Sequence, residues 1–214
     1  MRDVIIATEN VGKYREIVSL LDNTFDRYHS LKDFTDEVTV NEDQPHYVSN
    51  ALKKARKVGD RFGMAALSDD SGLEVSALQG RPGLYSSRYG KDDEDRIARL
   101  LNELKDVPPE KRQAVFKSYV VLYLPETDRW YVFYGELRGF IGLEKHGTGG
   151  FGYDPVFYEP VLGKYLAELS VTDKNTLSHR GRALLSMKTF LNVDFYRSTS
   201  ILAHHRPTAR NTSK

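Results

Sequence analysis

The residues that decide the fold stand near the start of the chain, where positions 4–13 read VIIATENVGK. The apolar run Val4 to Ala7 predicts a buried strand, and apolar residues recur at helical spacing from Asn10 onward. The stretch therefore predicts a strand, a tight turn and a helix. A helix start leaves backbone N–H groups free and its dipole favours an anion, so Lys13 beside this turn indicates phosphate binding. Capping of the helix by Thr8 or Asn10 explains the same residues without a ligand.

The later sequence alternates helical and β patterns. Apolar residues recur at helical spacing over Tyr47–Phe62, over Ile97–Leu104, and from about Asp173 to Leu191. Two β-rich stretches, Ala114–Leu124 and Trp130–Ile141, flank Pro-Glu-Thr-Asp, which has the composition of a hairpin turn. We therefore predict a mixed α/β protein whose loops gather toward one cleft.

Composition limits the function classes. The 214 residues predict one domain, placed at 1–197, with a flexible polar tail at 198–214. A formal net charge of +1 provides no global field that would attract nucleic acid or an acidic bilayer, and no apolar run is long enough to span a membrane. The absence of cysteine excludes disulfides and thiolate metal sites and fits a reducing compartment. We expect a cytoplasmic protein with neither nucleic acid nor membrane as a partner.

Two adjacent carboxylates stand in the first third of the chain. Residues Met64–Leu67 predict a short strand that ends at Asp69 and Asp70, with Leu73–Leu78 pairing back, so that at least one carboxylate projects from a constrained turn. One or two carboxylates and a substrate phosphate suit Mg²⁺, and Glu42 is a candidate second ligand. An Asp-Asp-Ser-Gly turn also forms without any metal.

A glycine-rich loop follows the predicted hairpin, where residues 147–155 read GTGGFGYDP. Four glycines beside two aromatic residues and one carboxylate indicate close backbone approach to a flat ligand. An aromatic ring can stack on a base while Asp154 accepts a hydrogen bond from a base or sugar donor. The alternative is a structural turn with packed aromatic residues.

Residues 174–180 read KNTLSHR and place three basic side chains near a helix start. If this is one helix, its spacing turns Lys174 away from His179 while the segment lines one wall of a pocket. A histidine at such a position is more often structural than catalytic.

These segments occur in one order along the chain, as Thr8–Lys13, Ser68–Val75, Gly80–Gly83 with Ser86–Tyr89, Gly149–Pro155 and Ser178–Gly181. In that order they resemble the inosine triphosphate pyrophosphatase family, which hydrolyses nonstandard purine nucleoside triphosphates. The resemblance covers nearly the whole chain. It implies a mixed β-sheet flanked by helices, two lobes around a central substrate cleft, a homodimer, and Mg²⁺-dependent cleavage of ITP, dITP or XTP between the α and β phosphates.

The resemblance also implies residue roles. Asp70 matches the catalytic aspartate, which holds the metal together with Glu42 and accepts a proton from water. The turn that binds the triphosphate matches Thr8, Glu9, Asn10, Val11, Gly12 and Lys13. The other positions that match substrate-binding residues are Lys54, Ser71, Phe151, Gly152, Tyr153, Asp154, Lys174, His179 and Arg180.

One segment departs from the family pattern. Relatives commonly carry two adjacent acids followed by Thr or Asp and then Gly before the second helix, whereas this chain reads Asn-Glu-Asp-Gln at positions 41–44. Glu42 still lies twelve residues before Lys54, in the register of the family's metal-binding glutamate, and Asp43 is a possible substitute. The tail beyond about Phe195 extends past the usual end of the family.

Selection among purines is expected to rest on the 6-position. A donor such as His179 or Arg180 pairs with the 6-carbonyl of inosine or xanthosine and loses its partner when the base is adenine. Exclusion of guanine does not follow from this, and a clash at its 2-amino group is one hypothesis. Two other functions stay open, a pyrophosphatase for other modified nucleotides and a nucleotide- or RNA-binding module. The module would use a basic strip formed by Lys53, Lys54, Arg56 and Lys57.

Overall fold

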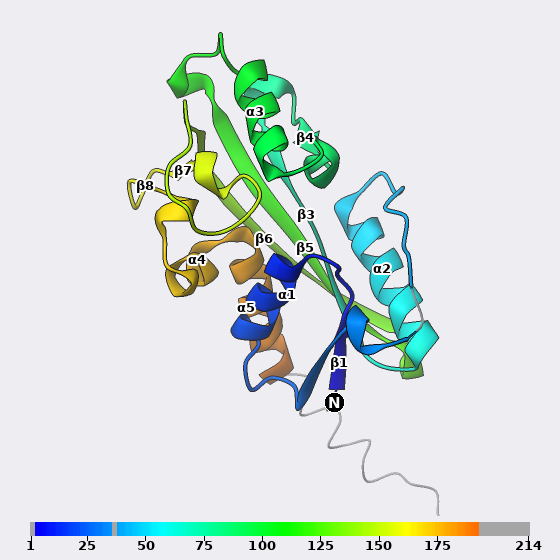
Figure 1. The fold of residues 1–214 in the computed structure, drawn as a ribbon. Helices are drawn as coiled ribbons and strands as arrows, with labels where there is room; N and C mark the ends of the chain where they lie inside the picture. Colours follow the sequence, from blue (N-terminus) through cyan, green and yellow to red (C-terminus); the bar gives the residue numbers. More distant parts are fainter. Residues whose placement is uncertain (1–2, 36–37, 193–214) are drawn as a thin grey trace, which may run out of the picture.

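The computed structural model describes residues 3–35 and 38–192, in which eight strands form one mixed sheet flanked by five α-helices (Figure 1). The strands are β1 (Asp3–Ile6), β2 (Arg27–Ser30), β3 (Ala66–Val75), β4 (Pro82–Gly83), β5 (Gln113–Leu124), β6 (Arg129–Ile141), β7 (Phe157–Glu159) and β8 (Lys164–Tyr165). The α-helices are α1 (Val11–Leu20), α2 (Tyr47–Phe62), α3 (Asp93–Glu103), α4 (Val171–Leu177) and α5 (His179–Phe190). The predicted mixed sheet with flanking helices is confirmed.

The strand order is β2-β1-β3-β5-β6-β7-β8, and β4 pairs with β3 outside this path. β1 pairs in parallel with β2 and β3, and the remaining pairs are antiparallel. The predicted hairpin is confirmed, because β5 and β6 pair from Gln113–Phe140 to Leu124–Arg129. The first strand therefore lies between the edge strand β2 and the long strand β3, and the turn that follows it lies beside β3.

The two faces of the sheet have different coverings, as Figure 1 shows with α2 on one side and α1 and α5 on the other. Successive side chains of a strand point to opposite faces. In β3, Leu67 packs with α1 and α5, whereas Ala66 packs with α2. The same alternation places Asp69 on the α1 and α5 face and Asp70 on the α2 face.

The α1 and α5 face carries two apolar clusters rather than one. The first includes Leu67 of β3 and Val120 of β5, and the second includes Leu73 and Phe116 of the same strands. Polar residues occupy the strand positions between them, including Asp69 and Ser118. The centre of this face of the sheet, between the two apolar clusters, is therefore lined by polar side chains. The division into two lobes stays a prediction.

The predicted end of a strand at the two aspartates is wrong. β3 runs through both, with Asp69 paired to Val120 and Asp70 to Tyr119, and it ends only at Val75. The ladder satisfies the backbone groups, while Ser118, Ser71 and cationic side chains satisfy the Asp69 carboxylate. Because the sequence alone does not show these side-chain partners, two adjacent acidic residues within a strand resemble the end of a strand.

The single helix predicted from about Asp173 is also wrong. Ser178 ends α4 and caps α5, where its Oγ accepts from the backbone N–H of Gly181 at 3.0 Å. Val11 belongs to the apolar residues that recur at helical spacing from Asn10 onward and predict one inward face, yet as the first residue of α1 it is 49% exposed. The predicted tail at 198–214 lies outside the described residues. No helix in the described ranges has the length and hydrophobicity needed to cross a bilayer.

Candidate functional site

A cavity of about 720 Å³ opens where the start of α1, the middle of β3, the loop before α2 and the loop after β6 meet. This volume is typical of sites for small molecules. All but two of the predicted site residues line it, namely Thr8, Glu9, Asn10, Lys13, Glu42, Lys54, Asp70, Ser71, Phe151, Gly152, Tyr153, Asp154, Lys174, His179 and Arg180. Val11 and Gly12 are not among the lining residues.

The turn before α1 is both a helix cap and part of the cavity wall. Asn10 Oδ1 accepts from the backbone N–H of Lys13 at 2.9 Å, and Thr8 Oγ1 accepts from that of Asn10 at 3.2 Å. Gly12 contributes indirectly, since a Cβ there would lie 2.7 Å from Cδ1 of Phe151. The missing side chain lets the Phe151 ring lie against the start of the helix.

Asp69 is a fully buried counter-ion. Its carboxylate lies 2.8 Å from Lys13 Nζ and 3.1 Å from Arg180 Nη2, and it accepts from Ser118 Oγ at 2.5 Å. Burial acts to raise the pKa of this carboxyl, but Arg180 and Lys13 hold it well below its usual range. Asp69 is therefore an ionised group whose bonding capacity is taken by the protein.

Glu16 completes this charge cluster and was not predicted from the sequence. Its buried carboxylate accepts from Lys174 Nζ at 2.7 Å and also contacts Arg180 Nη1. Burial acts to raise the pKa of Glu16, yet Arg180 and Lys174 lower it. The helix break at Ser178 explains why both cations reach one carboxylate. The only signal in the sequence is that Glu16 precedes Ile17 on the inward side of the first helix.

Asp70 differs sharply from its neighbour. Burial raises the pKa of its carboxyl, and Lys54 and Lys13 only partly oppose that rise. Oδ1 accepts from the backbone N–H of Ser71 at 3.1 Å and lies 3.9 Å from Lys54 Nζ. Oδ2 is buried and has no hydrogen-bond partner within the described part of the chain. A buried carboxylate oxygen without a partner is costly unless a ligand satisfies it.

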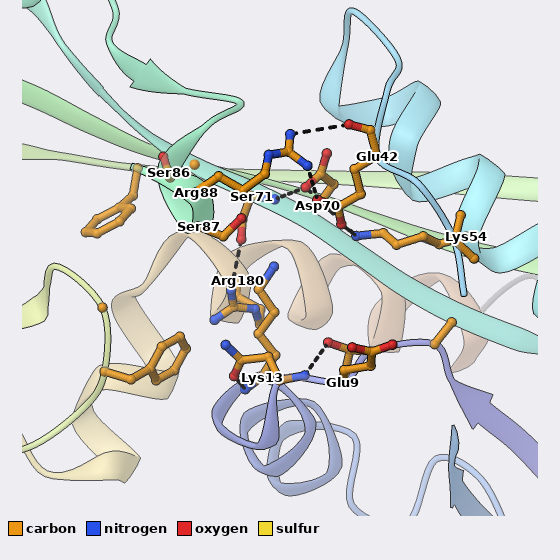
Figure 2. Close-up of a pocket in the computed structure, with 18 of the residues that line it drawn as sticks. Glu9, Lys13, Glu42, Lys54, Asp70, Ser71, Ser86, Ser87, Arg88 and Arg180 are labelled. Atoms are coloured by element: carbon orange, nitrogen blue, oxygen red, sulfur yellow. Dashed lines mark hydrogen bonds and ion pairs between the residues drawn. The ribbon is translucent and has the colours of Figure 1, made fainter. Parts of the chain in front are cut away.

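Glu42 lies beside Asp70 and its position distinguishes it from Asp43. Lys54 Nζ donates to Glu42 Oε1 at 2.5 Å and to the Asp69 carbonyl at 2.9 Å, which fixes the lysine between the two carboxylates. Arg88 Nη1 lies 3.7 Å from Glu42 Oε2. Asp43 instead pairs with Lys53 at 2.7 Å, and its side chain is 58% exposed. Figure 2 shows Glu42, Lys54 and Asp70 gathered on one side, with Lys13 and Arg180 across from them.

The glycine-rich loop is held by buried charge. Asp154 Oδ2 accepts from Lys174 Nζ at 2.6 Å and from the backbone N–H of Phe151 at 2.8 Å. Lys174 Nζ lies 4.5 Å from the centre of the Phe151 ring. Tyr153 is a core residue whose hydroxyl donates to the Ser86 carbonyl at 2.9 Å. Asp154 and Tyr153 therefore shape the loop, and Phe151 is its aromatic side chain with room to meet a ligand.

His179 is buried at the start of α5 and stacks on Phe116, with 4.6 Å between ring centres. Burial holds the pKa of its imidazole well below the usual range, and the Arg180 charge adds to this effect. The ring is therefore neutral at pH 7. Its Nδ1 has no hydrogen-bond partner among the described residues and is available to a ligand.

The fit of a divalent cation rests on Asp70 and Glu42. No group of three or more His, Cys, Asp or Glu side chains with metal-ligand geometry occurs in the ranges the structure describes. Mg²⁺ needs fewer protein ligands than that, because it keeps several waters and is often held by one or two carboxylates plus a substrate phosphate. The free oxygen of Asp70 fits such an ion.

Other lining residues escaped prediction. Arg96 and Asp93 of α3, and Phe116 of β5, line the cavity beside the expected groups. Their segments read as an ordinary amphipathic helix and strand, which carry no signal for a site. Ser87 and Arg88, quoted above within a family segment but given no role, also line it.

An α/β sheet that gathers a basic turn, two carboxylates and an aromatic loop around one cavity defines the class of nucleotide-binding α/β proteins. The chain belongs to the Ham1 family, whose model matches residues 4–190. The family resemblance seen in the sequence is thereby confirmed.

Relatives with assigned names agree with this membership. The chain is 47% identical to a dITP/XTP pyrophosphatase of Geobacter sulfurreducens over 194 residues, which cover 89% of this chain and 97% of the relative. It is 40% identical to a dITP/XTP pyrophosphatase of Halalkalibacterium halodurans, with 90% and 100% covered. The solved structure of a HAM1 protein from Coxiella burnetii is similar with a TM-score of 0.81 at 35% identity, covering 90% of this chain and 99% of that one.

Proposed function

We propose that this protein hydrolyses nonstandard purine nucleoside triphosphates, ITP, dITP and XTP, between the α and β phosphates. The products are the nucleoside monophosphate and pyrophosphate, and the reaction clears such nucleotides from the pool. The observation that carries the proposal is the free, buried Oδ2 of Asp70, which stands beside Glu42 and Lys54 in a cavity that also holds Phe151.

The phosphate end of the site lies at the start of α1. Attack of water on an α-phosphorus needs positive charge near the leaving pyrophosphate and a group that accepts the water proton. Lys13, Lys54 and the N-terminus of α1 supply the charge. Asp70 is the proton acceptor, since its free oxygen and raised pKa make it a better base than an ordinary aspartate.

Glu42 and Asp70 are the residues that would hold Mg²⁺. When bound, the ion neutralises phosphate charge and lowers the proton affinity of a coordinated water. Lys54 lies between the two carboxylates and keeps them close without the ion.

The base end of the site lies between Phe151 and α5. The Phe151 ring stacks on the purine, and Arg180 and His179 face its 6-carbonyl. Most Arg180 donors bond to Asp69, Glu16 and Ser71, and because a guanidinium can only donate, its remaining N–H has no acceptor in the 6-amino group of adenine. Such a mismatch rejects a substrate by about 10⁴ where the polar groups are buried.

The sequence is also compatible with two other functions. A pyrophosphatase for other modified bases shares this phosphate end and is separated by a substrate panel. The binding module that never hydrolyses is disfavoured because its basic strip is occupied. Lys53 pairs with Asp43, Arg56 with Asp128, and Lys57 Nζ donates to the Thr39 carbonyl.

We also propose that the protein is a cytoplasmic homodimer, without nucleic acid or membrane as a partner. The exposed side chains Trp130, Val132 and Tyr134 alternate along β6 and give the sheet an apolar surface on which a second copy can pack. Light scattering after size-exclusion chromatography tests the dimer, and a monomer at micromolar concentration contradicts it.

The activity test uses purified protein, Mg²⁺ and a panel of ITP, dITP, XTP, ATP and GTP. We expect pyrophosphate and monophosphate from the first three, at rates far above those from ATP and GTP. Equal turnover of all five would end the claim of selectivity. Binding without any cleavage, unchanged in Asp70→Asn, would favour the module instead.

A further inference from the structure

The loop that carries Phe151 is held by contacts with α3 as well as with Lys174. At the start of α3, Asp93 Oδ2 accepts from the backbone N–H of Gly152 at 2.7 Å. Farther back in the same connection, Lys145 Nζ lies 2.6 Å from Glu94 Oε2. The first turn of α3 therefore lies against Gly152, the residue that follows Phe151.

Arg96 lies one turn into α3, and Asp93, the residue that holds Gly152, also orients its side chain. Its Nη1 donates to Asp93 Oδ1, the second oxygen of the carboxylate that holds Gly152. Its charge is near enough to Tyr153 to oppose the rise in the pKa of that phenol that burial causes. Arg96 lines the cavity beside Gly152 and Tyr153 of the glycine-rich loop, which the proposed function assigns to the base.

One buried nitrogen of the guanidinium is without an acceptor in the described structure. Arg96 Nε is buried and has no hydrogen-bond partner in the ranges that the structure describes. A buried N–H without an acceptor is unfavourable, and a guanidinium can only donate. A ligand group that satisfies it must be an acceptor, such as a carbonyl oxygen.

The chemistry of the purines supplies a matching acceptor at a defined place. Positions 2 and 6 stand at the two ends of one edge of the ring. Xanthine has a carbonyl at both, hypoxanthine has hydrogen at position 2, and guanine has an amino donor there. The proposed function places Arg180 and His179 of α5 at the 6-position, and Arg96 lines the same cavity from a different helix, α3, so its donor is assigned to the 2-position.

We propose that Arg96, oriented by Asp93, is a specificity-determining residue that donates from Nε to the 2-carbonyl of xanthine and opposes the 2-amino group of guanine. This inference rests on the proposed function and deepens it. It gives a physical reason for excluding GTP, since guanine sets one donor against another although its 6-carbonyl satisfies α5. ITP is accepted because its 2-hydrogen neither pairs nor clashes.

The experiment compares kcat/KM for XTP, ITP and GTP in wild type, Arg96→Met and Arg96→Lys. In Arg96→Met we expect the XTP-to-ITP ratio to fall by about tenfold and the GTP-to-ITP ratio to rise by a similar factor, because the free donor is gone. Arg96→Lys keeps the charge but loses the fixed N–H, so its ratios should lie between the other two. Ratios within twofold of wild type in both variants would overturn the proposal.

Two matched variants separate specificity from loop placement. Arg99 lies one turn along α3, pairs with Glu103 and is not among the lining residues, so Arg99→Met should leave both ratios unchanged. Asp93→Ala should raise KM for all three substrates, because it releases Gly152 and shifts Phe151, and it should also move the ratios toward those of Arg96→Met, because Arg96 loses the carboxylate that orients it. A change of ratios in Arg99→Met as large as in Arg96→Met would contradict the assignment.

A binding readout keeps this inference apart from the proposed function. Wild type should bind xanthosine monophosphate at least about fivefold more tightly than guanosine monophosphate, and Arg96→Lys should narrow that difference. Equal binding of the two monophosphates by wild type would overturn the role of Arg96 even if ITP and XTP are cleaved. Absence of pyrophosphate release from ITP and XTP, with the binding preference intact, would instead contradict the proposed function alone.

Discussion

Asp69 and Asp70 are adjacent in sequence, yet they lie in opposite electrostatic environments on the two faces of β3. Asp69 faces α1 and α5, where Lys13, Arg180 and Ser118 use its oxygens. Asp70 faces α2, where one oxygen remains without a partner in the described structure. The alternation of a strand produces this difference, because neighbouring side chains point to opposite faces.

The comparison separates stabilisation from chemistry. A buried carboxylate surrounded by cations contributes to the fold but has no capacity left for a ligand. A buried carboxylate with too few partners is unfavourable by itself and is suited to bind a cation or accept a proton. The adjacent groups therefore do different work, and each can be tested against the other.

The largest expected effect is on catalysis. Asp70→Asn removes the proton acceptor and a metal-binding oxygen, so kcat for ITP should fall by about 10² to 10⁴ or more. Its melting temperature should equal or exceed that of wild type, because a buried charge with few partners is lost. Steady-state kinetics and thermal melts without added metal measure both. An active or strongly destabilised variant would contradict this role.

The second effect is on stability. Asp69→Asn leaves the partly buried Lys13 without its counter-ion and the buried Arg180 with Glu16 alone, and it should cost about 3 to 5 kcal/mol of unfolding free energy. Urea denaturation measures the loss. If Asp69→Asn is as stable as Asp70→Asn, the two carboxylates contribute equally to stability and the proposed difference between the two faces is wrong.

Metal dependence distinguishes the two acids before α2. Glu42→Gln should raise the Mg²⁺ concentration for half-maximal activity by at least about tenfold, because it removes a candidate ligand. Asp43→Asn is the matched control, since Asp43 pairs with Lys53 at the surface. If Asp43→Asn has the larger effect, Asp43 is the ligand and Glu42 is not.

The pH dependence of stability should have opposite signs for the two aspartates. The lowered pKa of Asp69 means that its contribution is present above the ordinary value of 3.8 and is lost as pH falls through the folded value. The raised pKa of Asp70 means that its ionisation destabilises the fold as pH rises from 3.8 through the folded value. Denaturation of wild type, Asp69→Asn and Asp70→Asn without metal, from pH 3 to 7, checks the signs. If the unfolding free energy of the two variants changes with pH in the same way, the opposite signs predicted for the two aspartates are wrong.

The smallest effect concerns Gly12. A methyl group there would lie 2.7 Å from the Phe151 ring, so Gly12→Ala should displace the ring and raise KM for ITP by about tenfold with little change in kcat. Kinetics with ITP measure the change. Loss of kcat at constant KM would place the effect at the phosphate end instead.

Most of the individual helices, strands and turns could be predicted from the sequence, but the long-range contacts between them could not. The first strand and helix, the cap at Asn10 and the β5–β6 hairpin follow from periodicity and turn composition, which are local properties of the chain. The segments that meet in the cavity also carry local signals in glycine, acidic and basic residues. The continuity of β3 and the helix break at Ser178 do not, because both depend on partners that are distant in sequence.

By itself the sequence determined the family, the class of fold and the residue types available for a nucleotide, since these are carried by motifs and composition. Only the tertiary structure decided that Asp69 is a counter-ion, that Glu16 binds two cations, and that Asp70 and Arg96 each keep a buried polar atom without a partner among the described residues. The physical reason is that charge, burial and unmet hydrogen bonds are properties of surroundings, and those surroundings come from segments up to 164 residues apart.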